Sequence, residues 1–253
     1  MKTKQFKQNR KAWFRGLKQF LKINYKRPQF IYWGEKPTER AIILSNHVST
    51  VPPMMLEIYA DYPIRFWGTH EMNSGLKKMY KYQSEVYYHQ KRGFNLHLSR
   101  LLCLLASPLT NIFYKGLNLI STYQDARLRT TLDQSLAAIK DNGENIVIFP
   151  EDSSDGYSDE LKGFHAGFVM LAEKCLQNGI DVPIYACYYK KKEHQYIFDA
   201  PVQYSQLKAQ FGDRHAIAEY MCMRCNTVGK MQLDKPQKMK IQTKLSPSKL
   251  TRK

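Results

Sequence analysis

Length, composition and charge set the first limits on this chain. Its 253 residues are 43% hydrophobic and 24% charged, which is typical of a folded protein with a sizeable core and excludes a disordered chain. Lysine and arginine number 39 against 22 acidic residues, for a formal net charge of +17. Such an excess indicates an anionic partner, and the candidates are nucleic acid, an anionic lipid surface and an acidic substrate.

The N-terminal segment is both basic and apolar. Trp13, Leu17, Phe20 and Leu21 follow helical spacing, and lysine and arginine fill the gaps between them. We predict that residues 1–27 form a basic amphipathic helix that contacts an anionic membrane. The alternative is a helix packed on the protein's own core with a solvated basic face. No cleavable signal peptide is visible, because no apolar stretch follows the basic start.

The remaining predicted elements alternate between strands and helices. A buried strand at 41–44 precedes a helix that starts at Pro52-Pro53, and strands follow at 64–68 and 118–123. Segment 98–120 is apolar but is interrupted by charged residues and a proline, so we interpret it as buried helices in preference to an interfacial helix. The later segments are predicted as a helix (130–142, ended by Gly143), a strand (146–149), a helix (161–178), strands (183–188 and 195–199) and a helix (206–227).

This alternation predicts an α/β fold, with a mixed, mostly buried β-sheet flanked by helices. The domain spans residues 28–228, and residues 229–253 form a basic tail rich in Lys, Gln, Ser and Pro that we predict to be disordered.

The five cysteines are an odd number and lie scattered along the chain, which fits a reducing compartment better than a disulfide framework. Cys222 and Cys225 form a lone C-x-x-C pair, and on a helix the two share a face. Because a zinc site needs two more ligands and no second pair exists, we predict no metal site.

Two polar loops follow predicted buried strands, where reactive groups of α/β sheets collect. The first loop is Ser45-Asn46-His47-Val48-Ser49, and its histidine is well placed to act as a general base. The second runs from Phe149 through Pro150, Glu151, Asp152, Ser153, Ser154 and Asp155 to Gly156.

Together these loops resemble the glycerol-phosphate and lysophospholipid acyltransferase superfamily, the lysophosphatidate acyltransferases in particular. Asn46-His47 match the start of the family's N-H-x-x-x-x-D motif, and Phe149-Pro150-Glu151 match its F-P-E-G motif. Residues 120–124, 164–167 and 182–184 occupy the places of three further family motifs. The resemblance spans about residues 25–226, with order and spacing kept.

The resemblance implies an enzyme of phospholipid biosynthesis. His47 would be the base that takes the proton from an acceptor hydroxyl, and Glu151 would hold the acceptor's polar head, with Asn46 and Ser49 as loop supports. The acyl group would come from a thioester of acyl carrier protein or coenzyme A, with no cofactor, and the acceptor would resemble a lysophospholipid. The enzyme would be cytoplasmic and peripheral, on the inner face of the cell membrane.

The chain departs from the family pattern at three positions. Pro52 stands where the family aspartate orients the histidine, Gln124 stands where its arginine grips phosphate, and Asp152 replaces the glycine after Pro-Glu. We predict that Asp152 or Asp155 supplies the missing acid, because a carboxylate need only reach the ring nitrogen. We predict that Arg127 or Arg129 supplies the phosphate contact, next to Gln124.

Two alternatives remain open from the sequence. In one, the site is catalytically degenerate and the protein only binds lipid or an acyl carrier. In the other, the +17 chain binds nucleic acid, although no nucleic-acid-binding motif is present and the charge gathers at 2–27 and 235–253. A serine hydrolase is disfavoured, because the chain has no G-x-S-x-G elbow.

Overall fold

The computed structural model describes residues 10–47, 51–151 and 159–231. In chain order the elements are α1 (Ala12–Asn24), β1 (Gln29–Tyr32), β2 (Ile42–Ser45), α2 (Val51–Tyr59), β3 (Ile64–Thr69), α3 (His70–Asn73), α4 (Leu76–Lys81), the π-helix η1 (Tyr82–Lys91), α5 (Leu96–Leu117), β4 (Ile120–Thr122), α6 (Leu128–Asn142), β5 (Asn145–Ile148), α7 (Gly167–Gln177), β6 (Pro183–Lys190), β7 (Gln195–Phe198), β8 (Val202–Gln203), α8 (Tyr204–Phe211) and α9 (Arg214–Lys230).

Within the described residues, eight strands form one sheet in the order β1-β7-β6-β2-β5-β3-β4, with β8 paired to β6. Strands β6, β2, β5, β3 and β4 are mutually parallel, whereas β7 and β8 run antiparallel to β6. All residues of β2 and β5 are buried, because helices cover both faces of the sheet. The predicted α/β fold with a mixed, mostly buried sheet is confirmed.

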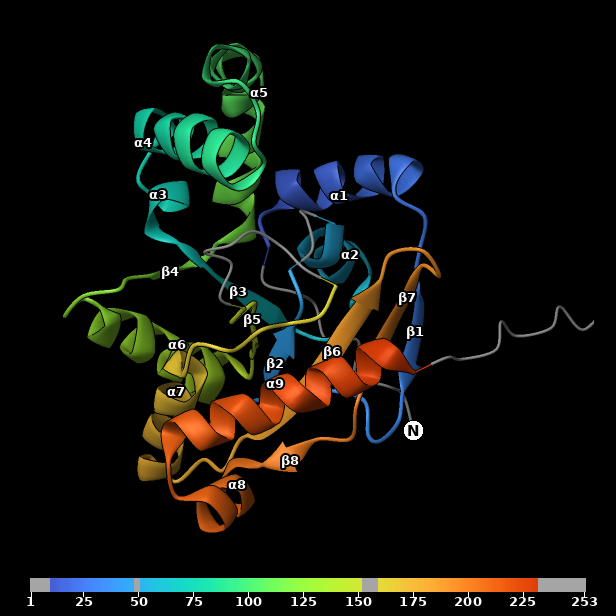
Figure 1. Cartoon of the computed structure of the whole chain (residues 1–253), viewed down its shortest axis with the longest axis vertical. Helices are drawn as coiled ribbons and strands as arrows, with labels where there is room; N and C mark the ends of the chain where they lie inside the picture. The colour runs from blue at the N-terminus through green and yellow to red at the C-terminus, as the bar shows by residue number, and fades with distance from the viewer. Residues whose placement is uncertain (1–9, 48–50, 152–158, 232–253) are drawn as a thin grey trace, which may run out of the picture.

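Alternate residues of the central strands pack against helices on opposite faces of the sheet (Figure 1). Ile42 and Leu44 belong to the core shared with α6, α7, α8 and α9. Ile43 belongs to the second core, which includes Phe14 of α1 and Leu56 of α2. The molecule is therefore a three-layer sandwich, and both cores come from apolar runs that the sequence shows as unbroken.

Two predicted helices have different bounds in the structure. The helix predicted over 161–178 begins only at Gly167, because Phe164 forms a β-bridge with Glu151. The helix predicted over 206–227 is two helices, α8 and α9. Gly212 ends α8 with a positive φ of 68°, and the Asp213 side chain caps α9 by accepting hydrogen bonds from the amides of His215 and Ala216.

The predicted N-terminal helix is present as α1, and one side of it is anchored to the domain. Phe14 is fully buried, whereas Trp13 is 45% exposed and Phe20 is 61% exposed. Arg10 and Lys18 both pair with the buried carboxylate of Glu57 in α2, at 2.9 and 3.0 Å. Helix α1 therefore packs on the core through one face and leaves a basic, aromatic face in solvent.

The interpretation of segment 98–120 as buried helices was wrong. Helix α5 occupies most of it, and the leucines along one side are exposed, Leu105 at 76%. Among the described residues α5 is the one helix with the length and composition of a membrane span. Short-range sequence pattern could not reveal this, because a helix with an apolar stripe looks the same whether protein or another medium covers the stripe.

At the other end of the chain, α9 continues through Lys230, so the first two residues of the predicted tail are helical. Residues 232–253 lie outside the described residues.

Candidate active site

Parallel pairing of β2 with β5 brings the two motif loops together. Leu44 is the register partner of Ile148, so the chain leaves both strands at the same edge of the sheet. Asn46-His47 follow one strand and Phe149-Pro150-Glu151 follow the other. Residues about a hundred positions apart in sequence thus become neighbours, at the carboxyl edge where the sequence placed them.

His47 contacts the Phe-Pro-Glu turn in two ways. Its backbone N–H donates to Oε2 of Glu151 at 3.3 Å. Its ring lies edge-on to Phe149, with ring centroids 4.9 Å apart. Phe149 in turn stacks on Phe66 of β3. The imidazole is half-buried on an aromatic support, which restricts its orientation while leaving one side open.

Glu151 is 8% exposed, and backbone contacts with the segment around Phe164 hold its loop in place. It forms an isolated antiparallel bridge with Phe164, and the amide of His165 donates to the carbonyl of Pro150 at 2.8 Å. The Phe164 segment, which the sequence singled out as a motif, thus fixes the Glu151 loop from the far side.

Asn46 is fully buried and ties its loop to β6. Its Nδ2 donates to the carbonyl of Tyr189 at 3.2 Å, and its Oδ1 accepts from the amide of Tyr189 at 2.8 Å. A side-chain amide can satisfy both backbone groups at once, which alanine or aspartate could not do. The position of His47, the next residue, therefore depends on Asn46.

Ser49, Asp152 and Asp155 lie outside the described residues. The acid that faces the His47 ring therefore stays a prediction.

Gln124, Arg127 and Arg129 lie in or just after the loop that follows β4, and all three are exposed. Arg127 is already engaged: its guanidinium lies 4.4 Å from the Tyr123 ring centroid and pairs with Asp125. Hydrogen bonds from Arg127 lower the pKa of Asp125 to about 2. Strand β4 is three positions from β2 in the sheet, so these residues share the carboxyl edge with His47 at a lateral distance of roughly 14 Å.

The structure brings a further histidine to this edge. His70 begins α3 directly after β3, where its Nδ1 lies 3.1 Å from Glu71. Its ring stacks on Tyr123, with centroids 5.1 Å apart. The contact joins the ends of β3 and β4, and the one signal for it in the sequence is a histidine two residues after the strand predicted at 64–68.

Cys222 and Cys225 share the buried face of α9, as helical spacing predicts. The Sγ of Cys225 donates to the carbonyl of Cys187 at 3.0 Å. Burial raises the pKa of the Cys222 thiol to about 11. Both are protonated at neutral pH and act as packing groups.

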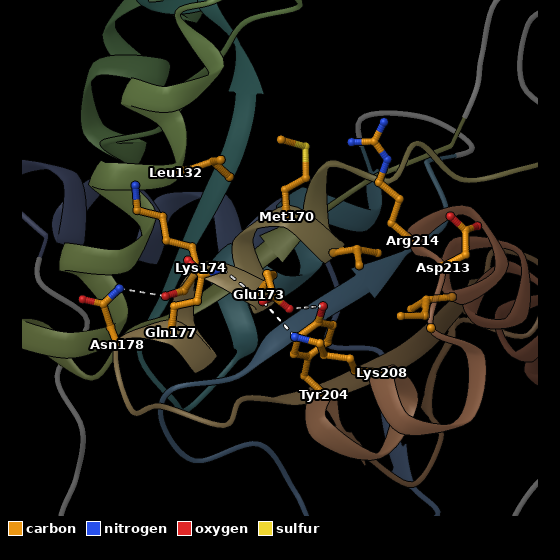
Figure 2. A pocket seen from close by; sticks show the side chains of 13 residues that line it. Leu132, Met170, Glu173, Lys174, Gln177, Asn178, Tyr204, Lys208, Asp213 and Arg214 are labelled. Atoms are coloured by element: carbon orange, nitrogen blue, oxygen red, sulfur yellow. Dashed lines mark hydrogen bonds and ion pairs between the residues drawn. The ribbon is translucent and has the colours of Figure 1, made fainter.

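A cavity of about 710 Å³ lies away from the motif loops, between α7, α8 and the start of α9 (Figure 2). Two of its charged groups are paired with each other: Glu173 accepts from Lys208 at 2.9 Å, and it also accepts from Tyr204 at 2.8 Å. Gln177 and Asn178 line it at the end of α7, shortly before β6 begins, so it lies toward the amino ends of the strands, opposite to His47.

Comparison with known proteins identifies the family. The model of the acyltransferase family matches residues 22–190, more than half of the chain, and includes both motif loops. The chain belongs to the acyltransferase family. The resemblance that the motifs indicated is thereby confirmed at the level of the family.

Among solved structures, a similar chain is the 1-acyl-sn-glycerophosphate (LPA) acyltransferase PlsC from Thermotoga maritima. The two share 12% identity over 88% of this chain and 80% of that one, with a TM-score of 0.49. The search of curated proteins found no match.

Proposed function

We propose that this acyltransferase moves a fatty acyl group from a thioester of acyl carrier protein or coenzyme A to a hydroxyl of a lysophospholipid or a glycerol-phosphate-like acceptor. The observation that carries the proposal is the contact between the His47 segment and Glu151 at the carboxyl edge of the sheet, in a chain of this family.

His47 is the general base. It takes the proton of the acceptor hydroxyl as the oxygen attacks the thioester carbonyl carbon. The new ester C–O bond forms, the C–S bond breaks, and the departing thiolate receives the proton back from the imidazolium. Asp152 or Asp155 orients the ring and stabilises its protonated form.

Glu151 and the cationic loop after β4 hold the acceptor between them. The carboxylate accepts hydrogen bonds from the polar head, and Arg127 or Arg129 contacts its phosphate, with Gln124 beside them.

The reaction takes place at an anionic membrane surface, with the protein peripheral on the inner face of the cell membrane. The exposed aromatic face of α1, with its dense cations, supports this part of the proposal.

Acyl transfer by the His47→Ala variant tests the proposal. We expect kcat to fall about 10²–10⁴-fold with lysophosphatidate and acyl-CoA or acyl carrier protein thioesters, because general-base catalysis contributes that much. The His215→Ala variant, at an exposed position on α9, is the matched control and keeps full activity. Thermal unfolding checks that both variants fold.

Full activity of His47→Ala would overturn the assignment of the base. A wild-type chain that transfers no acyl group from either thioester, yet binds it, would support the degenerate, binding-only alternative instead.

A further inference from the structure

A helical hairpin projects from the carboxyl edge of the sheet between β3 and β4. Residues 76–91 (α4 and η1) form its outgoing arm, and α5 returns to β4 (Figure 1). The hairpin leaves β3 after Thr69 and enters β4 at Ile120, which pairs in register with Trp67, two residues before the end of β3, so both ends of the hairpin are fixed near that edge. His47 and Glu151 lie at the same edge. They follow β2 and β5, and β5 is the neighbour of β3 in the sheet.

The two sides of α5 differ in what covers them. Ser99, Cys103 and Ser107, spaced four residues apart, are buried where α5 packs along η1. On the opposite side lies the leucine face, whose members are all at least 42% exposed: Leu98, Leu101, Leu102, Leu104, Leu105, Leu109 and Ile112. Neighbouring exposed leucines on one helix form an apolar patch of the kind that marks a binding surface.

The charges around the leucine face indicate which kind of partner covers it. Residues 70–117 carry seven lysines and arginines against two glutamates. Residues 1–34 carry no acidic residue at all. Helix α1 lies at the same end of the molecule as the hairpin (Figure 1), and its buried Phe14 packs on Phe113 of α5 with ring centroids 5.5 Å apart. Trp13 and Phe20 of α1 are exposed apolar side chains as well.

An apolar face framed by cations is complementary to an anionic lipid leaflet. A second copy of this chain would be a poorer partner, because a twofold contact would set the same cations against each other.

The composition of the hairpin favours lying on a bilayer over crossing it. Its outgoing arm carries Lys77, Lys78, Lys81, Glu85 and Lys91, and charged side chains are costly in the hydrocarbon core. Both of its ends also belong to one folded domain, so α5 alone cannot place them on opposite sides of a membrane.

We infer that the leucine face of α5 inserts into the outer layer of an anionic leaflet and seats the carboxyl edge of the sheet on the membrane. Such helices bury their apolar face about 5–10 Å into the boundary between head groups and acyl chains. Where the proposed function holds, the acceptor lipid then reaches His47 without leaving the leaflet.

A fluorescent label on the leucine face tests the inference in the full chain. All five native cysteines are buried, so a cysteine introduced at Leu105 reacts selectively with an environment-sensitive probe. With vesicles of phosphatidylglycerol and phosphatidylcholine, we expect the emission of the Leu105→Cys label to shift to the blue and to be quenched by brominated lipid. A Met223→Cys label, 55% exposed on α9, is the matched control and does not respond.

A second variant measures the contribution of the face. Because each of the two leucines contributes buried apolar surface, Leu105→Gln with Leu109→Gln lowers partition onto these vesicles by about 10²–10⁴-fold. Met223→Gln leaves it unchanged.

A Leu105 label that stays water-exposed on vesicles the protein binds overturns the inference. A second result would also overturn it: a label that is buried in the absence of vesicles, in a protein whose mass in solution is twice that of the monomer. That result would show that a second copy covers this face. Acyl transfer to a dissolved short-chain acceptor, measured in parallel, separates the two proposals. If the label inserts but no acyl group is transferred, the proposed function alone is overturned. If acyl transfer occurs but the label does not insert, the docking surface alone is overturned.

Discussion

At the scale of single residues, the candidate site depends on three side chains of different character. Asn46 is fixed by two hydrogen bonds to the backbone of β6, Glu151 by a bridge to Phe164, and His47 by the aromatic ring of Phe149. The sequence pointed to all three because each stands in a short motif after a buried strand. Their proximity in space follows from the pairing of β2 with β5, which no motif encodes.

The acid that orients His47 is the first residue-scale prediction. Asp152→Asn lowers kcat by up to about 10⁴, the loss seen when the orienting aspartate of a serine-protease triad is changed to asparagine. Loss of the negative charge also lowers the pKa of the imidazole, so the acid limb of the rate–pH profile moves to lower pH. A purely structural defect would reduce the rate without that movement.

Asp155→Asn is the matched comparison. If Asp155→Asn loses activity with the same change in pH profile while Asp152→Asn keeps it, the second carboxylate is the partner of His47. If both variants keep wild-type kinetics, neither acid orients the ring.

At the scale of elements, α1 and α5 meet at a close approach that only glycine permits. A Cβ on Gly116 of α5 would lie 2.0 Å from the ring of Phe14, which is fully buried. This contact fixes α1 against the helix that carries the leucine face. The sequence showed each helix as amphipathic, but not which side of either one the protein itself covers.

Gly116→Ala tests this contact. Since the Phe14 ring has no free space to move into, we expect the overpacking to lower the free energy of unfolding by about 1–3 kcal/mol in urea titrations. Gly16→Ala in α1 is the control: a Cβ there meets nothing within 4 Å, so it stabilises the helix by about 0.5–1 kcal/mol. Equal stability of Gly116→Ala and wild type would contradict the close approach.

At the scale of the whole molecule, the three-layer arrangement buries ionisable thiols and phenols on both faces of the sheet. Burial raises the pKa of Cys175 to about 12, and it raises the pKa of Tyr185 to about 12 on the other face. These groups stay protonated in the folded protein well above the pH at which they ionise in an unfolded chain.

Alkaline pH is therefore expected to destabilise the fold. A pKa raised in the folded state gives stability that is fully present below the unfolded value, about 9 for a thiol, and is lost as pH rises toward about 12. We expect the urea midpoint to be constant from pH 7 to about 8.5 and to fall steadily above about 9. Cys175→Ala, with one such group removed, should show a shallower fall, and a midpoint unchanged up to pH 11 would refute the linkage.

The sequence by itself determined the fold class, the strands of the central sheet, the positions of both loop motifs and the family. These depend on local signals, namely continuous apolar runs, glycine at helix ends and short motifs, that each act within a few residues. It placed the start of α7 wrongly because a bridge between Phe164 and Glu151 overrides local helical preference.

Only the tertiary structure decided which segments meet and which surfaces stay uncovered. The contact of His47 with Glu151 needs β2 and β5 to be neighbours, and the exposure of Leu105 needs α5 to pack through its serine and cysteine side. An apolar stripe specifies that a face must be covered, whereas what covers it depends on elements distant in the chain. The leucine face of α5 is an apolar stripe that no other part of the described domain covers.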